Sequence, residues 1–253
     1  MTGTIPTQVS KLTDLEGFWL GGNSISGTIP SVIDQMVSLN LLYLDNTAIT
    51  GSIPTQIGNI ANLQDLHLKN TFITGTIPTE IGNITRLLIL ELSQNEMTGT
   101  IPTQVSKLTD LEVFSLGGNS ISGTIPTVID QMISLNYLYL DNTFITGTIP
   151  TQIGNISNLQ ELSLENDELQ GNIPSELGRL TGLLYLDLDN NSFTGAVPGQ
   201  LSNLSNMKLV YLTGNNFSGG INNLFCNADF LKDFFADCYL PCDCCTDRVT
   251  DCF

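Results

Sequence analysis

The chain repeats a unit of 24 residues along almost its whole length, and this repeat is the feature that most limits how it can fold. The unit is clearest in residues 98–121, TGTIPTQVSKLTDLEVFSLGGNSI. Near-copies start at Thr2, Ser26, Thr50, Thr74, Ser122, Thr146, Gln170 and Thr194, and a degraded copy starts at Ser218. A single unit is too short to bury its own apolar residues. The repeat therefore predicts a solenoid, in which each unit is one coil stacked on the next.

The spacing of apolar residues predicts two strands in each coil. Phe114 and Leu116 are two residues apart, which is the spacing of a strand with one buried face. After a turn, Ile121, Gly123 and Ile125 show the same spacing. The second segment is therefore expected to form a short strand of its own.

The remainder of the unit predicts a helical turn. Val105, Leu108 and Leu111 recur every three residues, which is the period of a 3₁₀ helix. Pro102 prevents the second strand from continuing, and Thr103 is expected to cap the helical turn that follows.

One polar position in each coil is expected to point into the core. A buried polar group without a partner costs roughly 1–3 kcal/mol, so these side chains are expected to bond to the backbone of adjacent coils as a ladder. Threonine is shorter than asparagine, and the ladder is expected to be imperfect where threonine occurs. The column consists of Asn23, Thr47, Thr71, Asn95, Asn119, Thr143, Asp167, Asn191 and Asn215.

The pattern LxxLxLxxNxLxGxIPxxL resembles the plant-type leucine-rich repeat of extracellular receptor-like and polygalacturonase-inhibitor-like proteins, and it covers about residues 2–217. The resemblance implies an α/β solenoid. This would be a right-handed superhelix with a parallel concave sheet, short second strands and 3₁₀ turns. It also implies that ligands bind on the concave face. We expect about nine coils in residues 1–217 and a degraded repeat with a cysteine-rich cap in residues 218–253.

Composition excludes several kinds of partner. The formal net charge is −17 with only 8 Lys and Arg residues, so nucleic acid and anionic membranes are poor partners. A basic peptide, a neutral glycan or a cation would be compatible. The sequence shows no transmembrane segment and no signal peptide. It opens at Met1 in the middle of a coil without a capping unit, which indicates part of a longer protein.

All six cysteines lie in the last 28 residues, after the final repeat. They predict a disulfide-stapled C-terminal cap, whose fifteen possible pairings stay open; metal binding through the closely spaced cysteines is the alternative. The ending resembles the cysteine-rich tails of secreted or cell-surface leucine-rich repeat proteins of diatom-type algae. These cysteines are Cys226, Cys238, Cys242, Cys244, Cys245 and Cys252.

Five Asn-x-Ser/Thr sequons are candidate glycosylation sites. Together with the cysteines they favour an oxidising, extracellular or cell-surface setting. The sequon asparagines are Asn83, Asn155, Asn190, Asn203 and Asn216.

The residues that alternate with buried leucines on the first strand form the main candidate binding surface. This set contains the only Trp and most of the six Tyr residues, next to carboxylates. Rings supply contact area and carboxylates accept hydrogen bonds, so this surface suits recognition of a protein, peptide or glycan. The same residues would also serve simply as good strand formers. The candidates are Trp19, Tyr43, Asp45, His67, Glu91, Tyr137, Tyr139, Asp141, Glu161, Glu165, Tyr185, Asp187 and Tyr211.

The Thr-Gly-Thr motif suggests a second surface. Alternation would place both threonines outward in two flat ranks, with strands about 4.7–4.9 Å apart, and such an array resembles the ice-binding faces of antifreeze solenoids. The array fails at Asn172 and Ala196, and it can equally reflect duplication, since residues 98–169 copy residues 2–73. Its members are Thr2, Thr4, Ser26, Thr28, Thr50, Ser52, Thr74, Thr76, Thr98, Thr100, Ser122, Thr124, Thr146 and Thr148.

The sequence does not favour an enzyme or a cofactor. His67 is the only histidine, and no Gly-rich phosphate loop opens a helix. Calcium held by carboxylates of adjacent coils, Asp141, Glu165 and Asp189, is an alternative. We therefore predict a non-catalytic recognition module without cofactor or metal. Ice binding and a structural or adhesion role are the alternatives, and the ligand and oligomeric state stay open.

Overall fold

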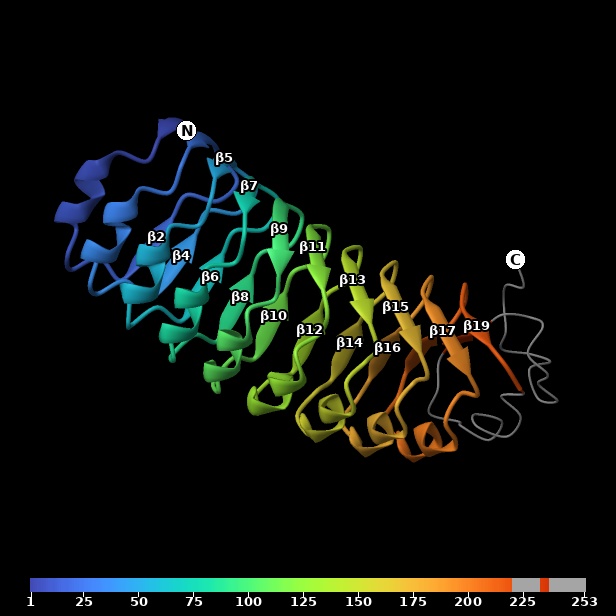
Figure 1. The fold of residues 1–253 in the computed structure, drawn as a ribbon. Helices are drawn as coiled ribbons and strands as arrows, with labels where there is room; N and C mark the ends of the chain where they lie inside the picture. The colour runs from blue at the N-terminus through green and yellow to red at the C-terminus, as the bar shows by residue number, and fades with distance from the viewer. Residues whose placement is uncertain (220–232, 237–253) are drawn as a thin grey trace.

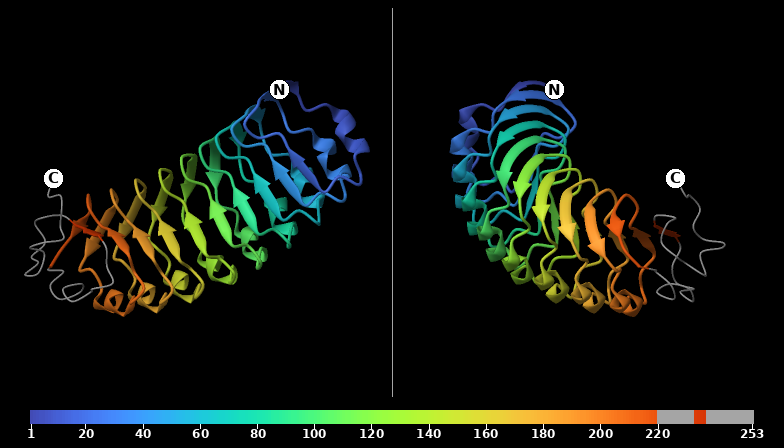
Figure 2. Two further views of the ribbon diagram at one scale, coloured as in Figure 1. Left: turned by 180° about the vertical axis from the view of Figure 1, so that it is seen from behind. Right: turned by 45° about the vertical axis from the view of Figure 1, so that its right-hand side comes forward.

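A computed structural model describes residues 1–219 and 233–236 of the chain. Over these residues the chain forms a curved, elongated stack of coils with the N-terminus at one end (Figure 1). Each complete coil contributes one 3₁₀ helix and one strand to each of two parallel sheets. The strands of each sheet follow one another in chain order along the stack (Figure 2). The predicted α/β solenoid is confirmed.

The first sheet contains the even-numbered strands, and we call its outward surface the concave face. Each residue pairs with the residue 24 positions later, as Phe114 does with Leu138, so equivalent positions of successive coils form straight columns. The strands are β2 (Gly17–Trp19), β4 (Leu41–Tyr43), β6 (Asp65–His67), β8 (Ile89–Glu91), β10 (Val113–Ser115), β12 (Tyr137–Tyr139), β14 (Glu161–Ser163), β16 (Tyr185–Asp187), β18 (Leu209–Tyr211) and β20 (Asp233–Phe235).

The second sheet contains the odd-numbered strands and has a different register. Thr100 lies opposite Ser122, so the offset between paired residues is 22 and equivalent residues of successive coils are staggered by two positions. The strands are β1 (Thr2–Thr4), β3 (Ser24–Gly27), β5 (Ala48–Gly51), β7 (Phe72–Gly75), β9 (Glu96–Thr100), β11 (Ser120–Gly123), β13 (Phe144–Gly147), β15 (Glu168–Gly171), β17 (Ser192–Gly195) and β19 (Asn216–Phe217).

The second strands are shorter than the alternation predicts. β11 ends at Gly123, so Ile125 lies beyond the strand. Gly123 has a φ of +81°, a left-handed conformation, but Gly99 has a φ of +83° and lies inside β9, so the glycine conformation alone does not end the strand. Only β1 and β9 include the second threonine of the motif, Thr4 and Thr100.

The predicted 3₁₀ turns are confirmed, but the predicted cap is wrong. Thr103 lies inside its helix, and the capping position is Pro102, which has an extended conformation and makes no side-chain cap bond. The N–H of Val105 donates to the Pro102 carbonyl at 3.1 Å instead. The helices are η1 (Thr7–Lys11), η2 (Ser31–Gln35), η3 (Thr55–Asn59), η4 (Thr79–Asn83), η5 (Thr103–Lys107), η6 (Thr127–Gln131), η7 (Thr151–Asn155), η8 (Ser175–Arg179) and η9 (Gly199–Asn203).

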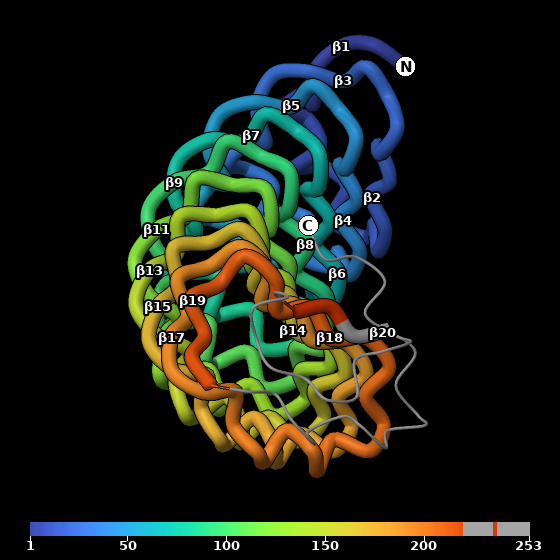
Figure 3. The backbone as a smooth tube through the Cα atoms, turned by 90° about the vertical axis from the view of Figure 1, so that its right-hand side faces the viewer, coloured from blue at the N-terminus to red at the C-terminus, as the bar shows by residue number. Residues whose placement is uncertain are grey.

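The interior of the coils is one continuous apolar core that runs the length of the described stack. Figure 3 shows the backbone of the coils stacked one behind another around this interior. The central residue of each even-numbered strand from β4 to β18 is buried, and Phe114 is among the largest of the fully buried side chains. Because each layer is covered only by its two neighbours, the stacking itself forms the core. The boundary predicted between residues 217 and 218 stays a prediction, and the six cysteines lie outside the described residues.

The expected ladder of polar side chains is present inside the turns. Asn119 donates from Nδ2 to the carbonyl of Leu92 in the preceding coil at 3.0 Å, and its Oδ1 accepts the N–H of Met97 at 3.0 Å. Thr47 reaches Leu44 O of its own coil, at 2.6 Å. The ladder is therefore complete at Asn119 and weaker at Thr47. The cause is the one expected from the sequence, since the threonine side chain is shorter than that of asparagine.

Candidate functional site

The even-numbered strands place the predicted binding residues on one surface. Trp19 is its most open aromatic residue and is 62% exposed. Its ring lies over Gly17, where a Cβ atom would come within 2.1 Å of the ring. The tyrosines are half-buried against neighbouring strands, and Asp187 is buried, with 4% exposed. The surface is therefore a packed layer of side chains with fixed positions.

Aromatic rings pair along this surface, including Tyr137 with Tyr139 at 6.3 Å on β12. Near the N-terminal end, Tyr43 stacks on His67 with ring centroids 4.2 Å apart and an interplanar angle of 11°, and Trp19 follows at 6.5 Å from Tyr43. Near the C-terminal end, Tyr211 stacks on Phe235 at 4.8 Å. Rings held in this way lose little conformational freedom when they contact a ligand.

Three tyrosines each donate a hydrogen bond to a carboxylate on the same surface. Burial, and then the hydrogen bond to Asp65, raises the pKa of Tyr43 to about 12. Burial likewise raises the pKa of Tyr139 and of Tyr185. The hydroxyls therefore stay protonated and hold the carboxylates in place. The pairs are Tyr43–Asp65 at 2.7 Å, Tyr139–Glu161 at 2.5 Å and Tyr185–Asp187 at 2.7 Å.

Carboxylates concentrate in the coils from β12 to β16. Burial raises the pKa of Glu165, and the nearby charges of Asp187 and Asp141 raise it further. Burial also raises the pKa of Asp187, against the lowering effect of its hydrogen bond from Tyr185. Each raised pKa reflects first the burial of the carboxylate and then its repulsion by neighbouring carboxylates. A cationic group placed here would relieve that repulsion.

His67 contributes to this surface as a neutral aromatic ring. Burial lowers the pKa of His67 by more than the charges of Asp65 and Glu91 raise it. Its Nε2 atom is buried and has no hydrogen-bond partner among the described residues. His67 therefore adds stacking area next to Tyr43 and no charge near neutral pH.

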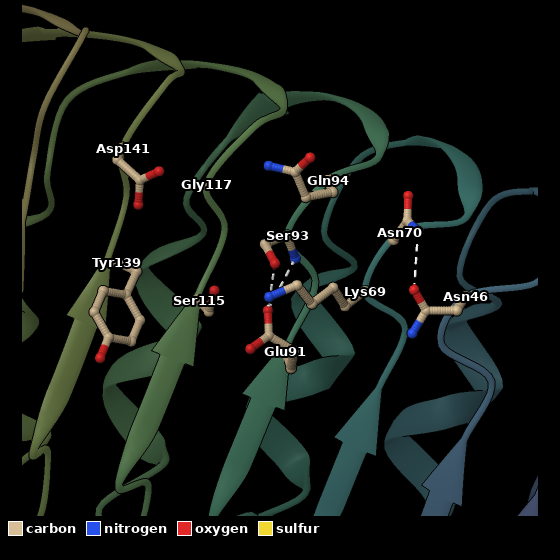
Figure 4. A pocket seen from close by; sticks show the side chains of 10 residues that line it. All are labelled: Asn46, Lys69, Asn70, Glu91, Ser93, Gln94, Ser115, Gly117, Tyr139 and Asp141. Atoms are coloured by element: carbon tan, nitrogen blue, oxygen red, sulfur yellow. Dashed lines mark hydrogen bonds between the residues drawn. The ribbon is translucent and has the colours of Figure 1, made fainter. Parts of the chain in front are cut away.

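A hollow of about 510 Å³ interrupts the concave face where the strands end. Figure 4 shows Lys69 on one side of it and Tyr139 with Asp141 on the other, with Ser115 and Gly117 between them. The hollow exists because its floor carries small side chains. It is lined by Asn46, Lys69, Asn70, Glu91, Ser93, Gln94, Ser115, Gly117, Tyr139 and Asp141.

Most of the lining was not singled out by the sequence. The candidate binding residues include Glu91, Tyr139 and Asp141. The alternation also puts Lys69 and Ser115 on the concave face, but they are not among the candidates. Serine and glycine do not by themselves indicate a binding site. A hollow arises only where such small side chains lie between larger side chains on adjacent coils. One sequence pattern could have indicated the hollow. The residues two positions beyond successive first strands change from charged Lys69 to small Ser93 and Gly117, and then to charged Asp141.

The Thr-Gly-Thr motif has a role in stacking the coils. Thr98 Oγ1 donates to the carbonyl of Gly75 in the preceding coil, at 3.4 Å. The methyl carbon of Thr100 lies only 2.9 Å from the position of a Cβ on Gly123 in the following coil. The first threonine of the motif thus donates a hydrogen bond to the preceding coil. The glycine has no side chain, which leaves room for the second threonine of the preceding coil.

The structure corrects the expected geometry of this threonine array. Its two ranks are not aligned across the coils, because Thr100 lies opposite Ser122 rather than Thr124. The serines and threonines of the motif are exposed, apart from half-buried Ser122 and Thr146. Phe72, on the same side of β7 as Thr74, is 52% exposed. The outward surface is therefore staggered and carries bulky residues beside the threonines.

Metal-binding clusters and membrane-spanning helices are both absent from the described ranges. In residues 1–219 and 233–236 no three His, Cys, Asp or Glu side chains come together in a way that could hold a metal ion. No helix in the same ranges has the length and apolar character needed to cross a bilayer. All five sequon asparagines are exposed, and their glycosylation stays a prediction.

Comparison with protein families identifies the fold family. The profile of the leucine-rich repeat region matches residues 74–242, and that of a single leucine-rich repeat matches residues 62–84. The chain belongs to the leucine-rich repeat family. A search of curated protein sequences finds no match to it.

Solved structures of plant leucine-rich repeat receptors are similar to this chain. One is the ectodomain of the membrane receptor kinase GASSHO1/SCHENGEN3 from Arabidopsis thaliana in complex with CASPARIAN STRIP INTEGRITY FACTOR 2, at 32% identity and a TM-score of 0.91 over 95% of this chain and 30% of that chain. Another is the Arabidopsis receptor kinase HAESA in complex with the peptide hormone IDA and the co-receptor SERK1. It has 34% identity and a TM-score of 0.85, over 90% of this chain and 38% of that chain. This leucine-rich repeat chain thus spans about a third of those chains.

A plant ice-binding protein of known structure is also similar. It shares 27% identity with a TM-score of 0.64, over 78% of this chain and 71% of that chain. The plant-type extracellular repeat family inferred from LxxLxLxxNxLxGxIPxxL is therefore confirmed, and its solved members include both receptor ectodomains and an ice-binding protein.

Proposed function

We propose that this chain is an extracellular, non-catalytic recognition module whose concave face binds an extended, positively charged peptide. The observation that supports this most is the surface formed by β12 to β18, where half-buried tyrosines alternate with carboxylates. Tyr139 and Tyr185 are held there by Glu161 and Asp187. Pre-positioned rings supply contact area without a large ordering cost, and the carboxylates select for basic groups.

The relatives support a peptide as the ligand. HAESA is described with a peptide hormone, and the similarity covers 90% of the present chain. The long parallel sheet offers a binding track rather than a closed pocket, and an extended chain can contact many columns of such a track. The net charge of −17 favours a basic ligand over an acidic one through long-range attraction.

Peptide binding can be tested with an immobilised library that varies net charge, followed by fluorescence anisotropy in solution. Basic peptides are expected to bind, and Tyr139→Ala is expected to weaken binding about tenfold or more, as for a central aromatic anchor. The matched control is Thr100→Ala, on the other sheet, which should leave affinity unchanged. A library in which no basic peptide binds, while glycans do, would overturn the proposal in favour of a glycan receptor.

Ice binding is the second candidate, and the similarity to a plant ice-binding protein favours it. The exposed threonines of the odd-numbered strands would supply the surface. Purified protein should then show a freezing gap and faceted ice crystals, and both should be lost in Thr100→Tyr but kept in Tyr139→Ala. Round crystals without a freezing gap would exclude this candidate. A structural or adhesion role would show neither activity.

A further inference from the structure

One column of residues at the edge of the concave face carries an ordered pattern of charge. It lies two residues beyond each even-numbered strand. Backbone hydrogen bonds keep it in register from coil to coil, for example from Asn46 N to Lys69 O at 2.9 Å and from Gly118 N to Asp141 O at 2.9 Å. After Gly21, the column reads negative, positive, neutral, neutral, negative, negative and negative, and then neutral at Thr213. The residues between these two are Asp45, Lys69, Ser93, Gly117, Asp141, Glu165 and Asp189.

Lys69 is the cation of this column, and its side chain is exposed. Two carboxylates of the adjacent coils are engaged with polar groups of their own coils. Asp45 Oδ2 accepts a hydrogen bond from Asn46 at 2.7 Å, and Glu91 Oε1 accepts one from the Ser93 hydroxyl at 2.5 Å. An anionic group on a ligand can therefore approach the ammonium group from the solvent side.

The neutral centre of the column is the floor of the hollow. Ser93 and Gly117 line it and leave about 510 Å³ open above them (Figure 4). A Cβ atom on Gly117 would lie 2.7 Å from both carboxylate oxygens of Asp141, so a larger residue here would displace that carboxylate. The floor can accommodate uncharged ligand residues and offers no charge of its own.

The far side of the hollow is anionic. Asn142 donates from Nδ2 to Asp141 Oδ2 at 3.0 Å and to Glu165 Oε1 at 3.2 Å, so one amide holds the two carboxylates side by side. Burial raises the pKa of Glu165 most, and the charges of Asp187 and, to a smaller extent, Asp141 raise it further, as expected of neighbouring carboxylates. Two adjacent basic groups on a ligand would relieve this repulsion by pairing with the two carboxylates.

From this arrangement we infer that the bound peptide runs along the column with an acidic residue at Lys69 and a pair of basic residues at Asp141 and Glu165. Lys69 and Asp141 are three coils apart, which is about 14 Å at the usual strand spacing. An extended peptide covers about 3.3–3.4 Å per residue, so the acidic residue and the first basic residue should be separated by about four positions. Either chain direction preserves this spacing. The inference rests on the proposed function, because it assumes a peptide on the concave face.

The spacing can be tested with peptides of identical composition. Each peptide carries one Glu and two adjacent Lys residues, and both of its ends are capped to remove the terminal charges. Glu and the nearer Lys are separated by one, four or eight positions. Each spacing is made twice, once with Glu before the Lys pair and once with Glu after it. Fluorescence anisotropy should show the four-position peptide binding about fivefold tighter than the others, the gain expected of one additional ion pair. Lys69→Glu should remove this preference.

The control variant is Lys107→Glu, which makes the same charge change at an exposed residue of η5. It should leave the spacing preference intact. Equal binding of all spacings, or equal effects of the two lysine variants, would overturn the charge register while leaving peptide recognition standing. Failure of every peptide to bind would instead reject the proposed function itself. Circular dichroism should show both variants folded, since both lysines are exposed.

Discussion

Asp167→Asn is expected to stabilise the protein by roughly 3 kcal/mol at pH 7 and to remove much of the pH dependence of its stability. Asp167 occupies the ladder position that is asparagine in several other coils. Its Oδ1 accepts hydrogen bonds from the N–H and the hydroxyl of Thr143, at 2.8 and 2.6 Å. Its Oδ2 is buried without a partner among the described residues. Asparagine would place a hydrogen-bond donor there.

The ladder explains why the ionised form is unfavourable. At Asn191 the Nδ2 group donates to the Leu164 carbonyl at 2.6 Å. The equivalent atom of Asp167 is Oδ2, which as a carboxylate can only accept hydrogen bonds. Burial raises the pKa of Asp167 from 3.8 to about 7, despite the hydrogen bonds from Thr143 that lower it. The protonated acid can donate as asparagine does, and the ionised acid cannot.

The direction of the pH effect follows from proton linkage. Between the unfolded pKa of Asp167, 3.8, and its folded pKa of about 7, the folded state holds a proton that the unfolded state has released. Stability therefore falls as pH rises through this window and changes no further above it on account of this group. At about pH 4 the variant and the original protein should be similar in stability, and the difference should grow towards pH 7.

Urea denaturation from about pH 4 to about pH 8 measures this effect. The matched control is Asp110→Asn, which removes the same charge from an exposed residue after η5 and so corrects for the change in net charge. Subtracting the control curve isolates the contribution of Asp167. Parallel Asp167→Asn and Asp110→Asn curves over the whole range would mean that Asp167 is ionised in the folded state and that burial does not raise its pKa.

Gly154→Ala is expected to destabilise the protein by about 3 kcal/mol, the upper end of the cost of overpacking. Gly154 is buried in η7, and a Cβ atom there would lie 2.3 Å from the carbonyl oxygen of Glu176 in the next coil. The obstacle is backbone, so no side chain can rotate away. The two coils would have to separate and lose contacts along both sheets. The same close approach occurs at Gly58, Gly82 and Gly178.

Gly199→Ala provides the control for this prediction. Gly199 begins η9, and a Cβ atom added there would have no other atom within 4 Å. The alanine should be neutral or stabilising by up to about 1 kcal/mol, because it restricts the unfolded chain. Urea midpoints compare the two variants, and amide hydrogen exchange should show faster opening at η7 and η8 in Gly154→Ala alone. Equal midpoints would show that the coils adjust without cost.

Repetition made the local structure readable from the chain. Phe114 and Leu116 indicated a strand, and Val105 with Leu108 indicated a 3₁₀ turn, because burial in a coil depends on residues only a few positions apart. Repeating that pattern predicted the sheet, the core and the polar ladder at Asn119. The prediction failed at Thr103, where the extended Pro102 takes the capping position.

The sequence by itself determined the coil, the stacking order and the residues of the concave face, since each follows from spacing within one unit. Only the tertiary structure decided the stagger that places Thr100 opposite Ser122, the hollow above Gly117, the bridging of Asp141 and Glu165 by Asn142, and the burial that raises the pKa of Asp167. The physical reason is the same in each case. Register, free space and desolvation are set by contacts between coils, which lie about two dozen residues apart in the chain and are not visible within the repeat.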